Sequence, residues 1–185
     1  LSVHKQHANR LLEPFVWVTG VISATAWDNF FHLRCHPDAQ PEMQRIAGMM
    51  RDAVDASTPV QRPWPGMSAI SDECWHLPYI TDDERKTYGC DPFGLAEVSA
   101  ARCARVSYKA FDGTTSEDAD RKLAGKLLAS GHLSPFEHPA QTWPYTFPKA
   151  RPDVTLGNFA NWRQYRNRIA AEYDRLGPRG LGAKE

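Results

Sequence analysis

The chain has 185 residues, in which 22 Lys and Arg residues balance 22 Asp and Glu residues. This size predicts one domain with a substantial core. The zero formal net charge disfavours general binding to nucleic acid or to a membrane surface. No run of about 18 apolar residues is available to cross a bilayer. The four cysteines are scattered without a Cys-x-x-Cys pair, which is typical of reduced thiols, and we expect a cytoplasmic protein.

The first residues, Leu1-Ser2-Val3, include neither an initiator Met nor the apolar core of a signal peptide. We therefore expect that an upstream portion is missing from the sequence. The remaining pattern predicts a single domain over residues 1–177. Residues 178–185, which follow a Gly-Pro pair, are expected to form a frayed tail.

Two elements are expected in the first third of the chain. Val16 to Ile22 is rich in β-branched and aromatic residues and fits either a strand or a buried helix, because periodicity does not decide between them. Asp38 has the properties of an N-cap, and Pro41 and Glu42 follow in the first turn of a helix. That helix continues to Val54 with an apolar face made of Met43, Ile46, Ala47 and Met50.

The central region, residues 55–95, contains many prolines and glycines. It is interpreted as an ordered loop with short elements, because its aromatic residues need a surface to pack on; these are Trp64, Trp75, Tyr79 and Phe93. A helix is then predicted from Ser116 to Gly131, with Leu123, Leu127 and Leu128 on its buried side.

A last helix is predicted from Asn158 to Leu176, because large apolar residues recur there at steps of three or four. These residues are Phe159, Trp162, Tyr165, Ile169 and Tyr173. Gly177-Pro178 would end this helix.

The clearest candidate site is the segment Gly131 to His138 (GHLSPFEH), which places two imidazoles, a hydroxyl and a carboxylate directly after a helix end. Ser134 before Pro135 fits the start of a new helix, where hydroxyl and amide groups bind phosphate or the polar groups of a flavin. The alternative is purely structural. Ser134 and Glu137 have the spacing of a capping box, which is a common motif.

Two arginines, Arg10 and Arg34, lie in otherwise apolar stretches. An Arg in such a setting tends to hold a fixed anion, either a ligand phosphate or a carboxylate of the protein. Internal ion pairs with Glu13 or Asp28 are an equally valid interpretation.

A zinc site is a further alternative, with His32, Cys35 and His36 near one another and with Cys74 and His76 as completing ligands. Their spacing does not match the usual paired knuckles of structural zinc sites. Hydrolase and nucleotide-phosphate motifs are also absent, since no nucleophile elbow and no Gly-rich phosphate loop occur.

Taken together, several blocks resemble the flavin-dependent thymidylate synthases. The blocks His4 to Pro14, Asn29 to Arg34 and Asp38 to Gln44 are similar in order and spacing to the C-terminal half of that family. The blocks Ala100 to Tyr108 and Gly131 to His138 resemble its N-terminal half. About half of the chain is covered, in the permuted order of the phage and bacterial branch. The family's Arg- and Ser-containing signature is not present and would lie upstream of Leu1.

The resemblance implies an α+β fold in which helices pack on a mainly antiparallel sheet, the thymidylate synthase-complementing type of fold. It implies that Arg34 is the catalytic arginine beside the uracil ring. Substrate contacts are implied for Arg10, Arg34, Gln164 and Arg166, and cofactor contacts for His132, Ser134, Asn29, Glu137 and Gln40. Ser23 and Thr25 stand where other members contact flavin through Asn and Arg.

The implied reaction is the reductive methylation of dUMP to dTMP. Methylenetetrahydrofolate supplies the carbon, and NADPH reduces the FAD cofactor. The resemblance also implies a homotetramer whose active sites form between subunits. Two alternatives remain: a degenerate member that binds flavin or nucleotide without turnover, and an unrelated zinc-supported α+β domain.

Overall fold

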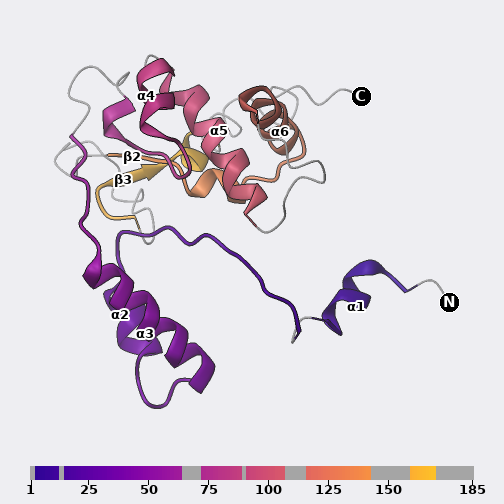
Figure 1. The fold of residues 1–185 in the computed structure, drawn as a ribbon, viewed down its shortest axis with the longest axis vertical. Coiled ribbons are helices and arrows are strands. Elements are labelled where there is room, and N and C mark those ends of the chain that lie inside the picture. Colours follow the sequence, from indigo (N-terminus) through magenta and orange to yellow (C-terminus); the bar gives the residue numbers. More distant parts are fainter. Residues whose placement is uncertain are drawn as a thin grey trace.

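The computed structural model describes residues 3–12, 15–63, 72–88, 91–106, 116–142 and 159–169. Within these ranges, α-helices are combined with a small antiparallel sheet of three strands, which confirms the predicted α+β class. Helices α4, α5 and α6 gather around the sheet as one body, whereas α2 and α3 form a pair beside it and α1 lies apart (Figure 1). No described helix has both the length and the apolar character that a membrane span requires.

The two longest helices of the body begin at side-chain caps. Helix α5 (Pro92–Arg105) follows Asp91, whose carboxylate accepts a 2.9 Å hydrogen bond from the Gly94 amide. Helix α6 (Glu117–Ala129) follows Ser116, whose hydroxyl accepts a 3.2 Å hydrogen bond from Ala119. Gly131, with a φ of 72°, redirects the chain after α6. The predicted helix from Ser116 to Gly131 is therefore confirmed.

Small side chains allow α5 and α6 to approach closely. Ala96, Ala100 and Ala101 of α5 and Ala124 of α6 are fully buried in the same core. Trp75 and Phe136 are the largest side chains enclosed by this core, and the predicted apolar side of α6 packs against it through Leu123, Leu127 and Leu128. The core thus lies between α5, α6 and one face of the sheet.

The sheet has the order β1 (Trp75–His76), β2 (Ala140–Thr142) and β3 (Trp162–Gln164), with both pairings antiparallel. Because side chains alternate along a strand, Trp75 enters the core while His76 points to the opposite, more exposed face. The prediction of one helix from Asn158 onward is wrong for β3, whose backbone pairs with β2. Residues 165–169 are helical, and Tyr165 and Ile169 are buried as the spacing suggested; Asn158 and residues 170–185, including the expected tail, lie outside the described ranges.

The central region contains the short elements that were predicted. They are a 3-10 turn, η2 (Asp72–Cys74), strand β1 and helix α4 (Asp82–Tyr88), and α5 already begins within this region. A capping box starts α4: the Thr81 hydroxyl accepts from the Glu84 amide at 3.2 Å, and the Glu84 carboxylate accepts from the Thr81 amide at 2.8 Å. Trp75 and Phe93 pack as expected, Tyr79 is largely exposed, and Trp64 lies outside the described residues.

The N-terminal part contains α1 (Lys5–Arg10), α2 (Asp28–Arg34) and α3 (Pro41–Ala56). Helix α3 confirms the predicted helix, but its N-cap is Gln40 and not Asp38. Asp38 belongs to the preceding turn, where its carboxylate lies 3.5 Å from His36 Nδ1. Ala47 is buried, whereas other members of the predicted apolar face, Met43 and Ile46, are exposed.

The prediction of a strand or buried helix at Val16 to Ile22 is wrong. These residues adopt neither, and they run as an extended segment between α1 and α2 (Figure 1). Val16, Trp17, Val18 and Ile22 are all exposed. Their apolar composition reflects a surface that no other described part of this chain covers.

Candidate functional site

An extended segment before α2, residues 22–27, crosses one face of the body; we call it the strap. Ser23 Oγ lies 3.1 Å from His138 Nδ1. Thr25 Oγ1 accepts a 2.6 Å hydrogen bond from the Ala160 amide and donates a 3.3 Å bond to the Ala160 carbonyl oxygen. The strap is therefore fastened to the two segments that flank β2 and β3.

Strap residues help to line several cavities, and two of them concern the candidate site. The first, of about 300 Å³, is enclosed between the strap and the sheet by Ile22, Ser23, Ala24, Thr25, Trp27, His76, Ala140, Phe159 and Trp162. The second, of about 310 Å³, lies between the strap and α2 and is lined by Ile22, Ser23, Ala24, Ala26, Trp27, Asn29, Phe30, Leu33 and Arg34. We call them the sheet cavity and the α2 cavity. Both volumes are at the lower end of the range for small-molecule pockets.

The segment after α6 forms a single 3-10 turn, η3 (Ser134–Glu137). The predicted capping box is wrong, because the N-cap is Leu133 and no side chain caps the turn. His132 and Ser134 are exposed, and the His132 ring accepts or donates a 2.8 Å hydrogen bond with Ser130 Oγ. The hydroxyl of Ser134 is thus available at the surface and is not used by the backbone of η3.

Three of the predicted site residues come together at the end of this turn. The Glu137 carboxylate forms an ion pair with Arg166, and the Glu137 carbonyl oxygen accepts a 2.9 Å hydrogen bond from Gln164 Nε2. The adjacent His138 contacts the strap, and burial lowers the pKa of its ring, so that it is neutral at pH 7. Strand pairing between β2 and β3 is what brings these residues into contact.

Asn29 and Arg34 form a second group, because both line the α2 cavity. They lie in α2, one turn and a half apart, and both are exposed. Arg34 has no ion-pair or hydrogen-bond partner among the described residues, so the alternative of an internal pair with Asp28 is wrong. Glu13, the other proposed partner, lies outside those residues.

The other predicted site residues are not part of either group. Arg10 is the last residue of α1, which lies away from the body in Figure 1. Gln40 is exposed and serves as the backbone N-cap of α3, where its carbonyl oxygen accepts from the Gln44 amide at 2.9 Å. A single copy of the chain therefore brings together only part of the predicted set.

The zinc alternative has no geometric support in the described part of the chain, which contains no group of three or more potential ligands. Cys35 and Cys103 are free thiols there, Cys74 accepts a 3.5 Å hydrogen bond from Gln141 Nε2, and Cys90 lies outside it. Burial raises the pKa of the Cys103 thiol to about 12, so this thiol is unreactive at neutral pH.

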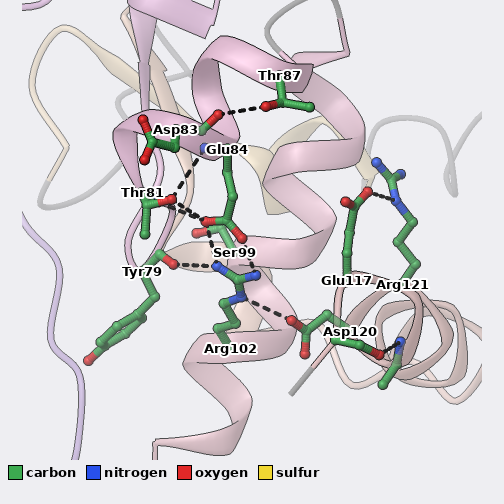
Figure 2. A network of polar contacts seen from close by, with 12 residues as sticks. Tyr79, Thr81, Asp83, Glu84, Thr87, Ser99, Arg102, Glu117, Asp120 and Arg121 are labelled. Carbon is green, nitrogen blue, oxygen red and sulfur yellow. Dashed lines mark hydrogen bonds and ion pairs between the residues drawn. The ribbon is translucent and has the colours of Figure 1, made fainter. Parts of the chain in front are cut away.

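Sequence reasoning missed a buried charge network between α4, α5 and α6 (Figure 2). Asp120 is completely buried, with Arg102 Nε 2.9 Å from Oδ2 and Arg105 Nη1 3.1 Å from Oδ1. Arg102 also donates to Glu84 at 2.6 Å and to the Tyr79 carbonyl oxygen at 2.7 Å. The hydrogen bonds from Arg102 hold the pKa of the Glu84 carboxyl at about 2. The sequence contained one sign of this network: the carboxylate of Asp120 lies one turn before Ala124, on the buried side of α6, where a charged residue needs a partner.

The fastening of the strap can be tested by limited proteolysis. Each hydrogen bond of this kind contributes about 1 kcal/mol, so the pair of substitutions Ser23→Ala and Thr25→Val should raise the population of detached strap about tenfold or more. Chymotrypsin cleavage after Trp27, followed by mass spectrometry, should accelerate accordingly. Thr58→Val, in the exposed stretch after α3, is the control. Equal cleavage rates in all three proteins would show that the strap is held by other contacts.

Comparisons of the chain with protein-family models, with curated proteins and with solved structures found no match in any of the three.

Proposed function

We propose that this protein is a flavin-dependent thymidylate synthase, which methylates dUMP reductively with methylenetetrahydrofolate and NADPH in an FAD-dependent reaction. The fold would then be of the thymidylate synthase-complementing type. The proposal rests on the sequence blocks described above. The observation that supports it best is the position of Arg34, which lines the α2 cavity and has no partner among the described residues.

An arginine in this position has a defined chemical use. Its guanidinium presents planar donors that match the oxygen and nitrogen edge of a pyrimidine. Positive charge at that edge stabilises negative charge that develops on the ring during reaction at C5. Asn29, which lines the same cavity, adds an amide donor and acceptor for orienting a bound ring.

The residues in and beside η3 fit a role in flavin binding. Ser134 presents a free hydroxyl, and the Glu137–Arg166 ion pair and the Gln164 amide fix the backbone beside it. FAD, when bound, supplies the hydride of the reaction. Each cavity has room for a single ring system and not for a whole dinucleotide, so the remainder of FAD would extend over the exposed His132 and Ser134.

Assembly with further copies is part of the proposal. The segment from Phe15 to Ile22 and the outer faces of α2 and α3 expose large apolar side chains, among them Trp17, Leu33, Ile46 and Met49. Apolar surface of this kind, contiguous along the chain, is typical of subunit interfaces. A homotetramer with shared sites would cover it and would bring Arg10 or Gln40 of one copy toward the cavities of another.

The test is release of tritium from [5-³H]dUMP by the full-length protein, given methylenetetrahydrofolate, NADPH and FAD. We expect tritium release that depends on all three additions, from a yellow, tetrameric protein. Reduction of FAD without tritium release would support the alternative, a degenerate member that binds flavin without turnover. A colourless protein without tritium release would refute both.

A further inference from the structure

The sheet cavity is lined mainly by aromatic and apolar side chains. Four of its residues carry aromatic rings: Trp27, His76, Phe159 and Trp162. Among the described residues, no Asp, Glu, Lys or Arg side chain lines it. Such a lining favours an uncharged ligand, and the faces and edges of the rings are complementary to another flat ring.

The aromatic walls are held in place from outside the cavity. The Trp27 indole N–H donates a 3.1 Å hydrogen bond to the Ala24 carbonyl oxygen, and its ring stacks on Phe31 with centroids 5.7 Å apart. Phe159 is buried, and Trp162 is fixed within β3. The aromatic walls of the cavity are therefore already in place without a ligand, as is usual for small-molecule sites.

Two polar groups at the cavity have no hydrogen-bond partner among the residues that the structure describes. The His76 ring meets the Trp162 ring edge to face at 6.4 Å, but neither side chain forms a hydrogen bond with any described residue. Burial, together with the nearby Arg62, Arg85 and His138, lowers the pKa of His76, so the imidazole is neutral at pH 7. A neutral imidazole offers one donor and one acceptor, and an indole N–H offers a donor.

From this geometry we infer that the sheet cavity binds a planar, uncharged nitrogen heterocycle, with His76 hydrogen-bonding its edge and Trp162 contacting its ring. The inference names a ligand class for the proposed function and rests on that function for the choice of ring. Flavin, pterin and uracil, the rings of that reaction, are all planar, uncharged nitrogen heterocycles. The charged portions of such ligands would lie outside, since the cavity is open on one side toward solvent.

Binding is measured by equilibrium dialysis with three separate probes: FAD, 5-formyltetrahydrofolate and dUMP. We expect at least one probe to bind and to quench tryptophan fluorescence. His76→Ala and Trp162→Leu should each weaken that binding about tenfold, the equivalent of one lost hydrogen bond or ring contact. His76→Gln, which keeps a donor and an acceptor, should restore most of the affinity. His36→Ala removes an exposed imidazole that does not line the cavity and is the matched control.

Hydrogen exchange on the unmodified protein provides a measurement that needs no variant. The effective probe should protect amides of residues 22–27 and of β1. The inference is overturned if no probe binds, if both variants bind as tightly as the unmodified protein, or if protection avoids these segments. Tritium release is scored separately. If a probe binds in a way that depends on His76 but no tritium is released, only the proposed synthase activity is refuted. If tritium is released but probe binding is unaffected by substitution of His76 and Trp162, only the assignment of the sheet cavity is refuted.

Discussion

Replacing Arg34 by alanine is expected to lower the rate of tritium release from dUMP by about a hundredfold or more, the usual effect of removing a group that stabilises charge in a transition state. The fold should be unaffected, because Arg34 is exposed and has no partner among the described residues. The unfolding midpoint in urea should therefore match that of the unmodified protein. Loss of activity with full stability is the combination that distinguishes a chemical role from a structural one.

Two further variants sharpen this experiment. Arg34→Lys keeps the charge but not the planar pair of donors, so it should recover only part of the rate. Arg45→Ala removes an exposed arginine of α3 that lines neither cavity, and it should leave the rate unchanged. Turnover by Arg34→Ala equal to that of the unmodified protein would remove Arg34 from the proposed mechanism.

Replacing Asp120 by alanine is expected to lower the free energy of unfolding by about 3–5 kcal/mol, the usual cost of leaving buried charge unpaired. The substitution would leave Arg102 and Arg105 without the carboxylate that both contact from α5. These arginine side chains are themselves largely buried, so water replaces the lost partner poorly. Urea unfolding followed by circular dichroism measures the change.

The control for this prediction is Lys86→Ala in α4. Lys86 pairs with Asp83 at 3.2 Å, but both side chains are exposed, and such surface pairs contribute about 0–1 kcal/mol. The two variants therefore remove ion pairs of similar length in different surroundings. A loss below about 1 kcal/mol for Asp120→Ala would show that the network in Figure 2 is not a determinant of stability.

Some of the local capping patterns in the sequence predicted helix ends correctly. Ser116 and Gly131 bound α6 as predicted, because capping depends on residues only a few positions apart. Within the described residues, two segments have the Ser/Thr-x-x-Glu pattern, at Thr81 and at Ser134, and only the first is a capping box. Pro139 follows the second segment closely and has no backbone N–H with which to continue a helix, and only one 3-10 turn forms there.

Elements and contacts that depend on pairing between distant parts of the chain were predicted less well. The apolar spacing around Trp162 predicted a helix, but pairing with β2 makes these residues a strand. The same pairing places Arg166 beside Glu137, a contact that no local pattern indicates. Similarly, Ser23 and His138 meet only because the strap crosses the body. The sequence thus predicted members of each group, but not that strand pairing gathers one group beside Glu137 while the other lines the α2 cavity.

The strand order of the sheet also constrains the time course of folding. Trp75 pairs with Gln141, and the intervening chain contains α4, α5 and α6. Closing so long a loop is entropically costly before the helices have condensed. We infer that α5 and α6 associate first and bring the ends of β1 and β2 together. The strap and the sheet cavity, which needs the completed sheet as a wall, would be assembled last.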